Sequence, residues 1–301
     1  MPENGNQTKT PGKEKKEGNE EEGDNAEDER LLFGEKREET TLFVGNDLGV
    51  TKIDVAASQI GQYSLLERCT VRCLATDGKY LVVASDEGVL LTTGEEFLAL
   101  GFEAATAVGI DDTWLYAACE NRVARLDRDG IDVSTGSSSG EWETVGEVSE
   151  PRRFEGSLLA TADGIVRVDA SVETLGLADA KDIAADGTLA ATAAGLYRRE
   201  DGDWTQVLAG DASAVIESGS SAYAIVDGAL FERDGNGWTE RTVPGDSPPV
   251  DLAYGKELAV ITEDGTVHVE ADPERTHDGH GGWRSQALGL RDVTGFVALG
   301  G

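Results

Sequence analysis

Several residue types are scarce in this sequence, and each shortage narrows what the protein can be. Its 301 residues include three cysteines, and no stretch reaches the roughly 18 apolar residues of a membrane-spanning helix. An odd number of cysteines in a long chain does not fit a secreted disulfide framework, so reduced thiols are expected. Residues 1–30 also lack an apolar run of signal-peptide length. We therefore expect a cytoplasmic protein that does not enter a membrane.

Positive charge is scarce as well. The chain has 26 Lys and Arg against 58 Asp and Glu, a net charge of −32 that repels phosphate backbones and anionic lipids. Nucleic acid and membranes are therefore disfavoured as partners. Arg supplies most of the positive charge after residue 40, where the remaining lysines are Lys52, Lys79, Lys181 and Lys256. An acidic, lysine-poor surface suits multimolar salt, which screens its self-repulsion within a few ångströms, and it resembles that of a haloarchaeal protein.

The composition changes near residue 33. Residues 1–33 are rich in Glu, Lys, Asn and Gly, and they offer too little apolar area to offset the entropy of ordering. From Thr41 onward, short β-rich apolar segments alternate with Asp-Gly-type turns up to the last residue. We predict a disordered acidic tail over residues 1–33 and a single all-β domain over residues 34–301.

One pattern repeats seven times in this domain: an apolar strand, a tight turn and a second apolar strand. The turns lie roughly 31 to 43 residues apart, which is the period of four-stranded propeller blades. Gly or Asn is expected at each turn because a hairpin needs positive φ there. The turn residues are Gly49, Gly88, Asn121, Gly164, Gly195, Gly228 and Gly265. The repeat predicts a seven-bladed β-propeller of four-stranded antiparallel blades.

Two further features agree with a closed ring. Residues 41–68 supply only three strands, so the terminal run 292–299 is expected to complete the first blade and remove the exposed sheet edges. An aromatic residue also opens the segment after the hairpin in six of the seven repeats: Tyr63, Phe97, Trp142, Trp204, Trp238 and Trp283. One aromatic per blade at a constant phase predicts packing between neighbouring blades.

The glycine-marked hairpins, aromatic-led outer strands and acidic composition resemble a haloarchaeal family of single-domain β-propellers of uncharacterised function. That family lies within the propellers similar to WD40 and YVTN repeats. The likeness covers about residue 32 to the end, but no blade carries the Gly-His or Trp-Asp signature of true WD40 repeats. The resemblance implies a fold and supplies no reaction.

Four local motifs have both a chemical and a plainer interpretation. Gly136–Gly140 matches Gly-x-Ser-x-Gly but lies in a polar loop without the strand and helix of a nucleophile elbow. The acidic residues of 127–132 are interpreted as a solvated turn rather than a calcium loop. His277 and His280 are the best transition-metal candidates, yet they fall in an inserted polar stretch. Cys69, Cys73 and Cys119 are interpreted as small hydrophobic residues rather than zinc ligands. No metal or cofactor is assigned from these motifs.

The mouth of the central channel is the remaining candidate site. Aligning the starts of the inner strands places one residue of each blade on a ring: Cys73, Ala107, Arg152, Asp182, Ala214, Asp251 and Asp292. Arg72, Lys181 and Arg291 precede three of these positions. The candidate binding residues are therefore Arg72, Arg152, Lys181, Asp182, Asp251, Arg291 and Asp292. They form either a ligand site or a solvated rim of mixed charge.

The sequence favours a non-enzymatic binding module, a monomeric protein-interaction scaffold in a halophilic cytoplasm whose partner it does not identify. This hypothesis depends on fold analogy and on the lack of recognisable catalytic chemistry. The alternative is a propeller hydrolase or lyase that uses a divalent cation at the channel mouth. In that case Asp182, Asp251 and Asp292 would supply oxygen ligands, and Arg152 would position an anionic substrate.

Overall fold

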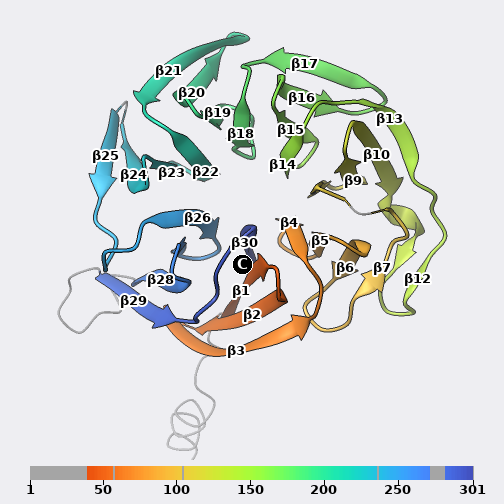
Figure 1. The fold of residues 1–301 in the computed structure, drawn as a ribbon, viewed down its shortest axis with the longest axis horizontal. Coiled ribbons are helices and arrows are strands. Elements are labelled where there is room, and N and C mark those ends of the chain that lie inside the picture. The colour runs from red at the N-terminus through yellow and green to blue at the C-terminus, as the bar shows by residue number, and fades with distance from the viewer. Residues whose placement is uncertain (1–38, 57, 104, 236, 272–281, 301) are drawn as a thin grey trace, which may run out of the picture. The chain divides into compact units, whose positions relative to one another are not determined.

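The computed structural model describes residues 39–56, 58–103, 105–235, 237–271 and 282–300, which form seven four-stranded antiparallel sheets. Figure 1 shows these sheets radiating from a central axis. In six sheets the strand earliest in the sequence lies beside the axis and the latest at the rim, whereas in the remaining sheet β30 lies beside the axis and β3 at the rim. The predicted seven-bladed β-propeller is confirmed. The predicted disordered tail, residues 1–33, lies outside the described residues.

Each blade runs from an inner strand at the axis to an outer strand at the rim. Blade 1 consists of β30 (Gly295–Leu299), β1 (Glu39–Asn46), β2 (Gly49–Ala56) and β3 (Gln59–Glu67). Blade 2 consists of β4 (Val71–Thr76), β5 (Leu81–Ser85), β6 (Gly88–Thr92) and β7 (Leu98–Ala99). Blade 3 consists of β8 (Ala107–Ile110), β9 (Trp114–Cys119), β10 (Arg122–Asp127) and β13 (Glu143–Glu147). Blade 4 consists of β14 (Pro151–Glu155), β15 (Leu158–Thr161), β16 (Gly164–Val168) and β17 (Val172–Gly176).

The other three blades follow the same order. Blade 5 consists of β18 (Ala180–Ile183), β19 (Leu189–Thr192), β20 (Gly195–Glu200) and β21 (Asp203–Ala209). Blade 6 consists of β22 (Ala212–Ser218), β23 (Ser221–Val226), β24 (Ala229–Asp234) and β25 (Gly237–Arg241). Blade 7 consists of β26 (Pro249–Tyr254), β27 (Leu258–Thr262), β28 (Thr266–Ala271) and β29 (Gly282–Ala287). A 3₁₀ turn (Arg128–Gly130) and a small hairpin of β11 (Ile131–Asp132) and β12 (Ser137–Ser138) lie between β10 and β13.

The ring is closed by the last strand of the chain. β30 pairs antiparallel with β1, with Phe43 opposite Val297 and Val44 opposite Phe296. The predicted closure by the C-terminal strand is thus confirmed. Because the inner strand of blade 1 comes from one end of the chain and its other strands from the opposite end, closure joins residues more than 240 positions apart.

The hairpin glycines are required by two features of the backbone. Gly49 has a φ of 138°, and a Cβ there would lie 1.8 Å from the carbonyl oxygen of Glu67. Gly88 is similar, with a φ of 118° and the carbonyl oxygen of Phe102 at 2.2 Å. A side chain is therefore excluded by conformation and by space. The expectation for blade 3 was wrong, because the positive φ falls on Glu120 (51°), the first residue of that turn, rather than on Asn121.

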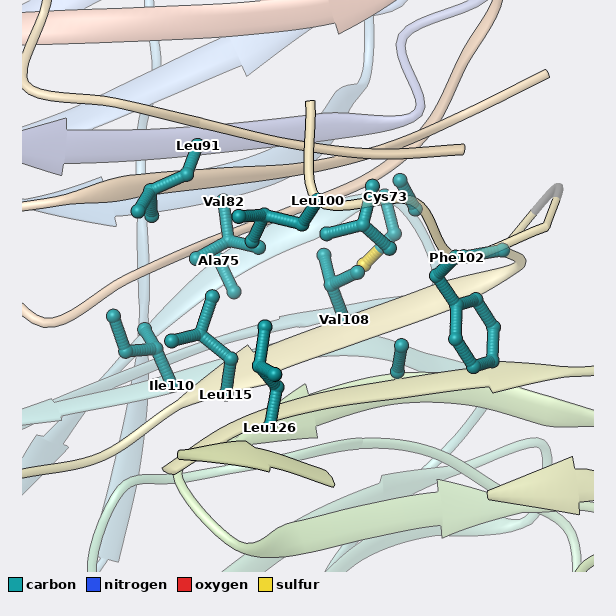
Figure 2. Packing of buried hydrophobic residues seen from close by; sticks show 14 of the residues in the cluster. Cys73, Ala75, Val82, Leu91, Leu100, Phe102, Val108, Ile110, Leu115 and Leu126 are labelled. Atoms are coloured by element: carbon teal, nitrogen blue, oxygen red, sulfur yellow. The ribbon is translucent and has the colours of Figure 1, made fainter. Parts of the chain in front are cut away.

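The core consists of seven apolar clusters in the described residues, one between each pair of neighbouring blades. Both faces of each blade are covered, so a strand such as β5 is buried along its whole length and shows no polar alternation. Figure 2 shows the cluster between blades 2 and 3, where Val82 and Leu91 face Val108 and Leu115. Burying each large apolar side chain contributes roughly 1.5–3 kcal/mol.

Five of the six repeated aromatic residues pack at these interfaces, as predicted. The indole N–H groups of three of them donate to backbone carbonyls of the preceding blade: Trp142 to Leu100 at 2.9 Å, Trp204 to Leu175 at 3.0 Å, and Trp283 to Thr242 at 3.0 Å. Phe97 and Trp238 pack against the clusters between blades 1 and 2 and between blades 5 and 6. Tyr63 is the exception, because 49% of its surface is exposed.

Candidate functional site

The inner strands β4, β14, β18, β22 and β26 share a β-bulge at their second residue. The register shifts between Val71 and Cys73 in β4, and at the equivalent position in the other four strands. A bulge inserts one unpaired residue and turns the next side chain. Three of the predicted binding residues, Arg72, Arg152 and Lys181, are these inserted residues. They are exposed or half-buried at the start of their strands.

The two half-buried cations at the bulges pair with acidic residues of the neighbouring connections. Arg152 donates to Asp179 at 2.7 Å and to the carbonyl oxygen of Ala180 at 3.0 Å, and Lys181 pairs with Asp211. Asp179 precedes blade 5 and Asp211 precedes blade 6, so each pair links consecutive blades. These contacts favour a rim of paired charges over a set of free cations that would bind an anionic ligand.

The residue after the bulge is charged and buried or half-buried in three of these strands, β14, β18 and β26. In β14 this residue is Arg153, whose Nη1 lies 3.0 and 3.1 Å from the two carboxylate oxygens of Asp251. Its Nε lies 3.4 Å from Oδ1 of Asp182. Blade 4 is thereby joined to blade 5 and, across the axis, to blade 7. We call Arg153, Asp182 and Asp251 the axial ion cluster.

Backbone groups complete the hydrogen bonding of this cluster. Asp182 accepts the N–H of Ile183 and the N–H of Val215, both at 2.9 Å, and Asp251 accepts the N–H of Leu252 at 2.8 Å. Both aspartates are buried, with 4% and 6% of their surfaces exposed. Burial raises the pKa of Asp182, while Arg153 and the two N–H groups oppose that rise. Burial also raises the pKa of the neighbouring Cys73 thiol.

Of the seven predicted binding residues, Asp182 and Asp251 belong to this cluster. Arg291 and Asp292 lie in the connection before β30, where the carbonyl oxygen of Arg291 accepts a hydrogen bond from Asn46 Nδ2 at 3.2 Å. Asp292 has a φ of 53°, which is uncommon for a residue other than glycine. The described contacts join neither side chain to Asp182 or Asp251. The predicted ring therefore divides into a buried pair and a set of rim residues.

Arg153 is the member of the cluster that aligning the starts of the inner strands did not select. Aligning Arg152 with Asp182 and Asp251 is wrong by one residue, because the bulge makes Arg153 their structural equivalent. A signal was present in the sequence. Pro151 and Pro249 each stand two positions before the charged residue in question, and aligning these prolines would have selected Arg153.

A cavity of about 200 Å³ lies in the channel beyond the axial ion cluster. Its lining comes from the middle and later residues of inner strands in five blades, and from Ala184 and Ala185, which follow β18 in blade 5. None of the seven predicted binding residues lines it. The walls present polar and apolar surface in similar amounts, and the apolar part includes the half-buried side chains of Ile216, Tyr254 and Ala298. Two acidic residues, Glu155 and Glu217, supply carboxylates. We call this space the axial cavity.

The other sequence motifs contribute no recognisable site. Asp132 accepts hydrogen bonds from the N–H and hydroxyl groups of Ser134, as in a solvated turn, and Ser137 and Ser138 lie exposed on β12. Among the residues that the structure describes, no group of three or more His, Cys, Asp or Glu side chains is arranged to hold a metal ion. His277 and His280 lie outside the described residues. No helix in the described ranges has the length and apolar character to cross a bilayer.

The closed ring, the clusters between blades and the bridged axis define a single seven-bladed β-propeller. The chain belongs to the HVO_0234-like beta propeller family, whose sequence model matches residues 26–299. The resemblance to a β-propeller family is thus confirmed. Comparison with curated proteins finds no significant match.

Solved structures show the same fold at low sequence identity. Apo AztD from Citrobacter koseri has a TM-score of 0.52 and 11% identity, over 88% of this chain and 99% of AztD. YCF48 bound to D1 peptide has a TM-score of 0.52 and 15% identity, over 73% of this chain and 82% of that one. The WD40 domain of Neurospora crassa Pan2 has a TM-score of 0.53 and 10% identity, over 73% of this chain and 82% of the Pan2 domain. At these identities the likeness concerns the fold alone.

Proposed function

We propose that the protein is a non-enzymatic binding module, a protein-interaction scaffold of a halophilic cytoplasm that contacts its partner through blade 1. The observation that carries this proposal is the distribution of exposed apolar side chains. In the described part of the chain, the exposed large hydrophobic residues are Leu48, Tyr63 and Leu65, with 65%, 49% and 39% of their surfaces exposed. All three lie in blade 1, and we call them the blade 1 patch.

The patch lies on and beside an open strand edge. Tyr63 and Leu65 belong to β3, the outermost strand of its sheet, and Leu65 packs beside Gly49, the residue next to Leu48. β3 has nine residues, of which only the last, Glu67, is charged, although 28% of the chain is charged. Natural proteins usually place charges on exposed edges to prevent pairing. A long uncharged edge with apolar side chains therefore favours addition of a partner strand.

The partner segment that suits this surface is extended, apolar at alternate positions and flanked by basic residues. Main-chain hydrogen bonds to β3 would supply affinity, and contacts with Tyr63 and Leu65 would set the register. Basic flanks would be attracted by a chain that carries a net charge of −32. The structure of YCF48 with D1 peptide offers an analogy for a propeller that binds a peptide.

The alternative, a hydrolase or lyase with a channel cation, gains no support from the axial geometry. Asp182 and Asp251 do converge, but they converge on the guanidinium of Arg153 and on backbone N–H groups. Their oxygens are thereby already engaged by donors. This arrangement suits a structural clamp across the axis better than a cation site.

The test is affinity purification from a lysate of the source organism at high salt, with three forms of the tagged protein. Tyr63→Lys/Leu65→Lys places two charges on the β3 edge, and Thr205→Lys/Thr239→Lys adds the same charge to exposed positions of β21 and β25. We expect a partner that is retained by the wild type and the control and lost from the β3 variant. Equal retention by all three forms would place the interface elsewhere. Thermal unfolding of each form confirms that the ring is intact.

A further inference from the structure

The basic side chains around the axial cavity are already paired with carboxylates. Arg153 is held by two carboxylates of the axial ion cluster, at 3.0 Å from Asp251 and 3.4 Å from Asp182. Glu217 pairs with Arg233 at 2.8 Å and accepts a hydrogen bond from the Thr188 hydroxyl at 2.8 Å. The cations closest to the cavity are therefore already engaged by carboxylates.

Glu155 is the carboxylate without such a partner. It is the last residue of β14, it lines the cavity, and no hydrogen bond or ion pair joins its side chain to the other described residues. Burial, assisted by the negative charge of Asp182, raises its pKa from 4.5 to about 7, and Arg153 lowers it by less. Arg153, the cation nearest to Glu155 in the cavity lining, is already shared by Asp182 and Asp251, so two carboxylates and Glu155 face one guanidinium. A cation entering the cavity would reduce this imbalance.

The walls of the cavity restrict the kind of cation. A divalent metal ion needs several oxygen ligands, whereas one unpartnered carboxylate is available here. The half-buried apolar side chains of Ile216 and Ala298 suit an alkyl group, and Tyr254 adds an aromatic ring to the lining. A volume of about 200 Å³ accommodates a short chain rather than a drug-sized ligand.

We propose that the axial cavity binds an alkylammonium group, with Glu155 as its counter-ion and the half-buried apolar side chains of β22, β26 and β30 around its alkyl chain. The group would belong either to a free small amine or to a lysine side chain that a partner inserts along the axis. This site is separate from the blade 1 patch, so either proposal can fail without the other.

Calorimetric titration of the full chain at about pH 8, where Glu155 is ionised, tests the proposal. The probes are n-butylammonium with n-butanol as its neutral counterpart, and a blocked Gly-Lys-Gly peptide with norleucine in place of lysine as its counterpart. Glu155→Gln removes the counter-ion, and Glu173→Gln removes an exposed carboxylate from the same blade. Thermal unfolding verifies that both variants fold.

We expect the wild type and Glu173→Gln to bind a cationic probe, and Glu155→Gln to bind it at least about tenfold more weakly. The neutral counterparts should bind much more weakly to every form. Binding of butylammonium would indicate a free amine as the ligand, and binding of the lysine peptide alone would indicate a partner side chain. If neither cation binds, or if Glu155→Gln binds as well as the wild type, the proposal is wrong.

Discussion

Oδ2 of Asp182 accepts a hydrogen bond of 2.9 Å from the backbone N–H of Val215, and this contact joins the inner strands of blades 5 and 6. The other oxygen of the same carboxylate accepts the N–H of Ile183 and contacts Arg153 of blade 4. One buried side chain thus ties three consecutive blades together beside the axis. A residue that the sequence suggested as a ligand-binding group has the surroundings of a structural one.

Replacing Asp182 by alanine should therefore lower the free energy of unfolding by about 3 kcal/mol or more. The change leaves the Val215 N–H without its acceptor and deprives Arg153 of one of its two carboxylates in a buried setting. Denaturant unfolding of wild type and variant measures the loss. Asp179→Asn serves as the control, because Asp179 forms a half-exposed pair with Arg152 that should contribute no more than about 1 kcal/mol, and asparagine tolerates the φ of 58° at this position. Equal losses in the two variants would contradict a clamping role for Asp182.

The fold could be predicted because its main determinants are local and repeated. A hairpin turn that needs positive φ selects glycine at the same point of nearly every blade, so the period is visible without tertiary information. Strands covered on both faces also appear in the sequence as continuous apolar runs. The closing strand could be predicted by counting strands, because residues 41–68 supply only three strands for blade 1 and the run 292–299 was left to provide the fourth. Glu120, which adopts the left-handed conformation at the turn of blade 3, shows that the rule is only a preference.

The site could be predicted less well because it depends on the bulges of the inner strands. In β14 the bulge moves the strand register by one residue, so Arg152 pairs at the rim and Arg153 reaches the axial ion cluster. The sequence comparison of the blades, which could not show the bulge, therefore selected Arg152 in place of Arg153. The contact between Arg153 and Asp251 crosses the axis between residues 98 positions apart, and no local pattern encodes it. The partial burial of Glu155 and its lack of a cationic partner among the described residues likewise arise only when the ring is assembled.

Trp204→Phe should destabilise the protein by about 1 kcal/mol. The phenyl ring keeps most of the packing between blades 4 and 5, but the hydrogen bond from the indole N–H to the carbonyl oxygen of Leu175 is lost. Denaturant unfolding measures this loss. Hydrogen exchange of the wild-type indole N–H provides a second test, because a bonded N–H exchanges slowly. Rapid exchange together with an unchanged stability would show that this bond does not form in solution.

His268 should reduce stability in mild acid. Burial lowers its pKa below the usual 6.5, and its Nδ1 lies 2.8 Å from the Ser285 hydroxyl. The unfolded chain therefore binds a proton more readily than the folded one, and the contribution of His268 to stability is lost as the pH falls below about 6.5. Unfolding free energies from about pH 5 to 8 should show a steeper acid loss in the wild type than in His268→Asn. Parallel pH profiles would mean that His268 titrates normally in the folded protein.

Glu155 should have the opposite effect on the pH dependence of stability. Its pKa rises from 4.5 in the unfolded chain to about 7 in the folded one, mainly through burial. The folded state thus holds the proton more tightly, and the contribution of this group is present below about pH 4.5 and is lost as the pH rises towards 7. Glu155→Gln removes the titration, so its stability relative to the wild type should increase over this range by at most about 3 kcal/mol, less where solvent in the cavity screens the charge. Denaturant unfolding of both proteins from about pH 4 to 8 measures the difference, with Glu173→Gln as the exposed control. If the difference stays constant with pH, Glu155 is ionised normally and the cavity is better solvated than a pKa of about 7 requires.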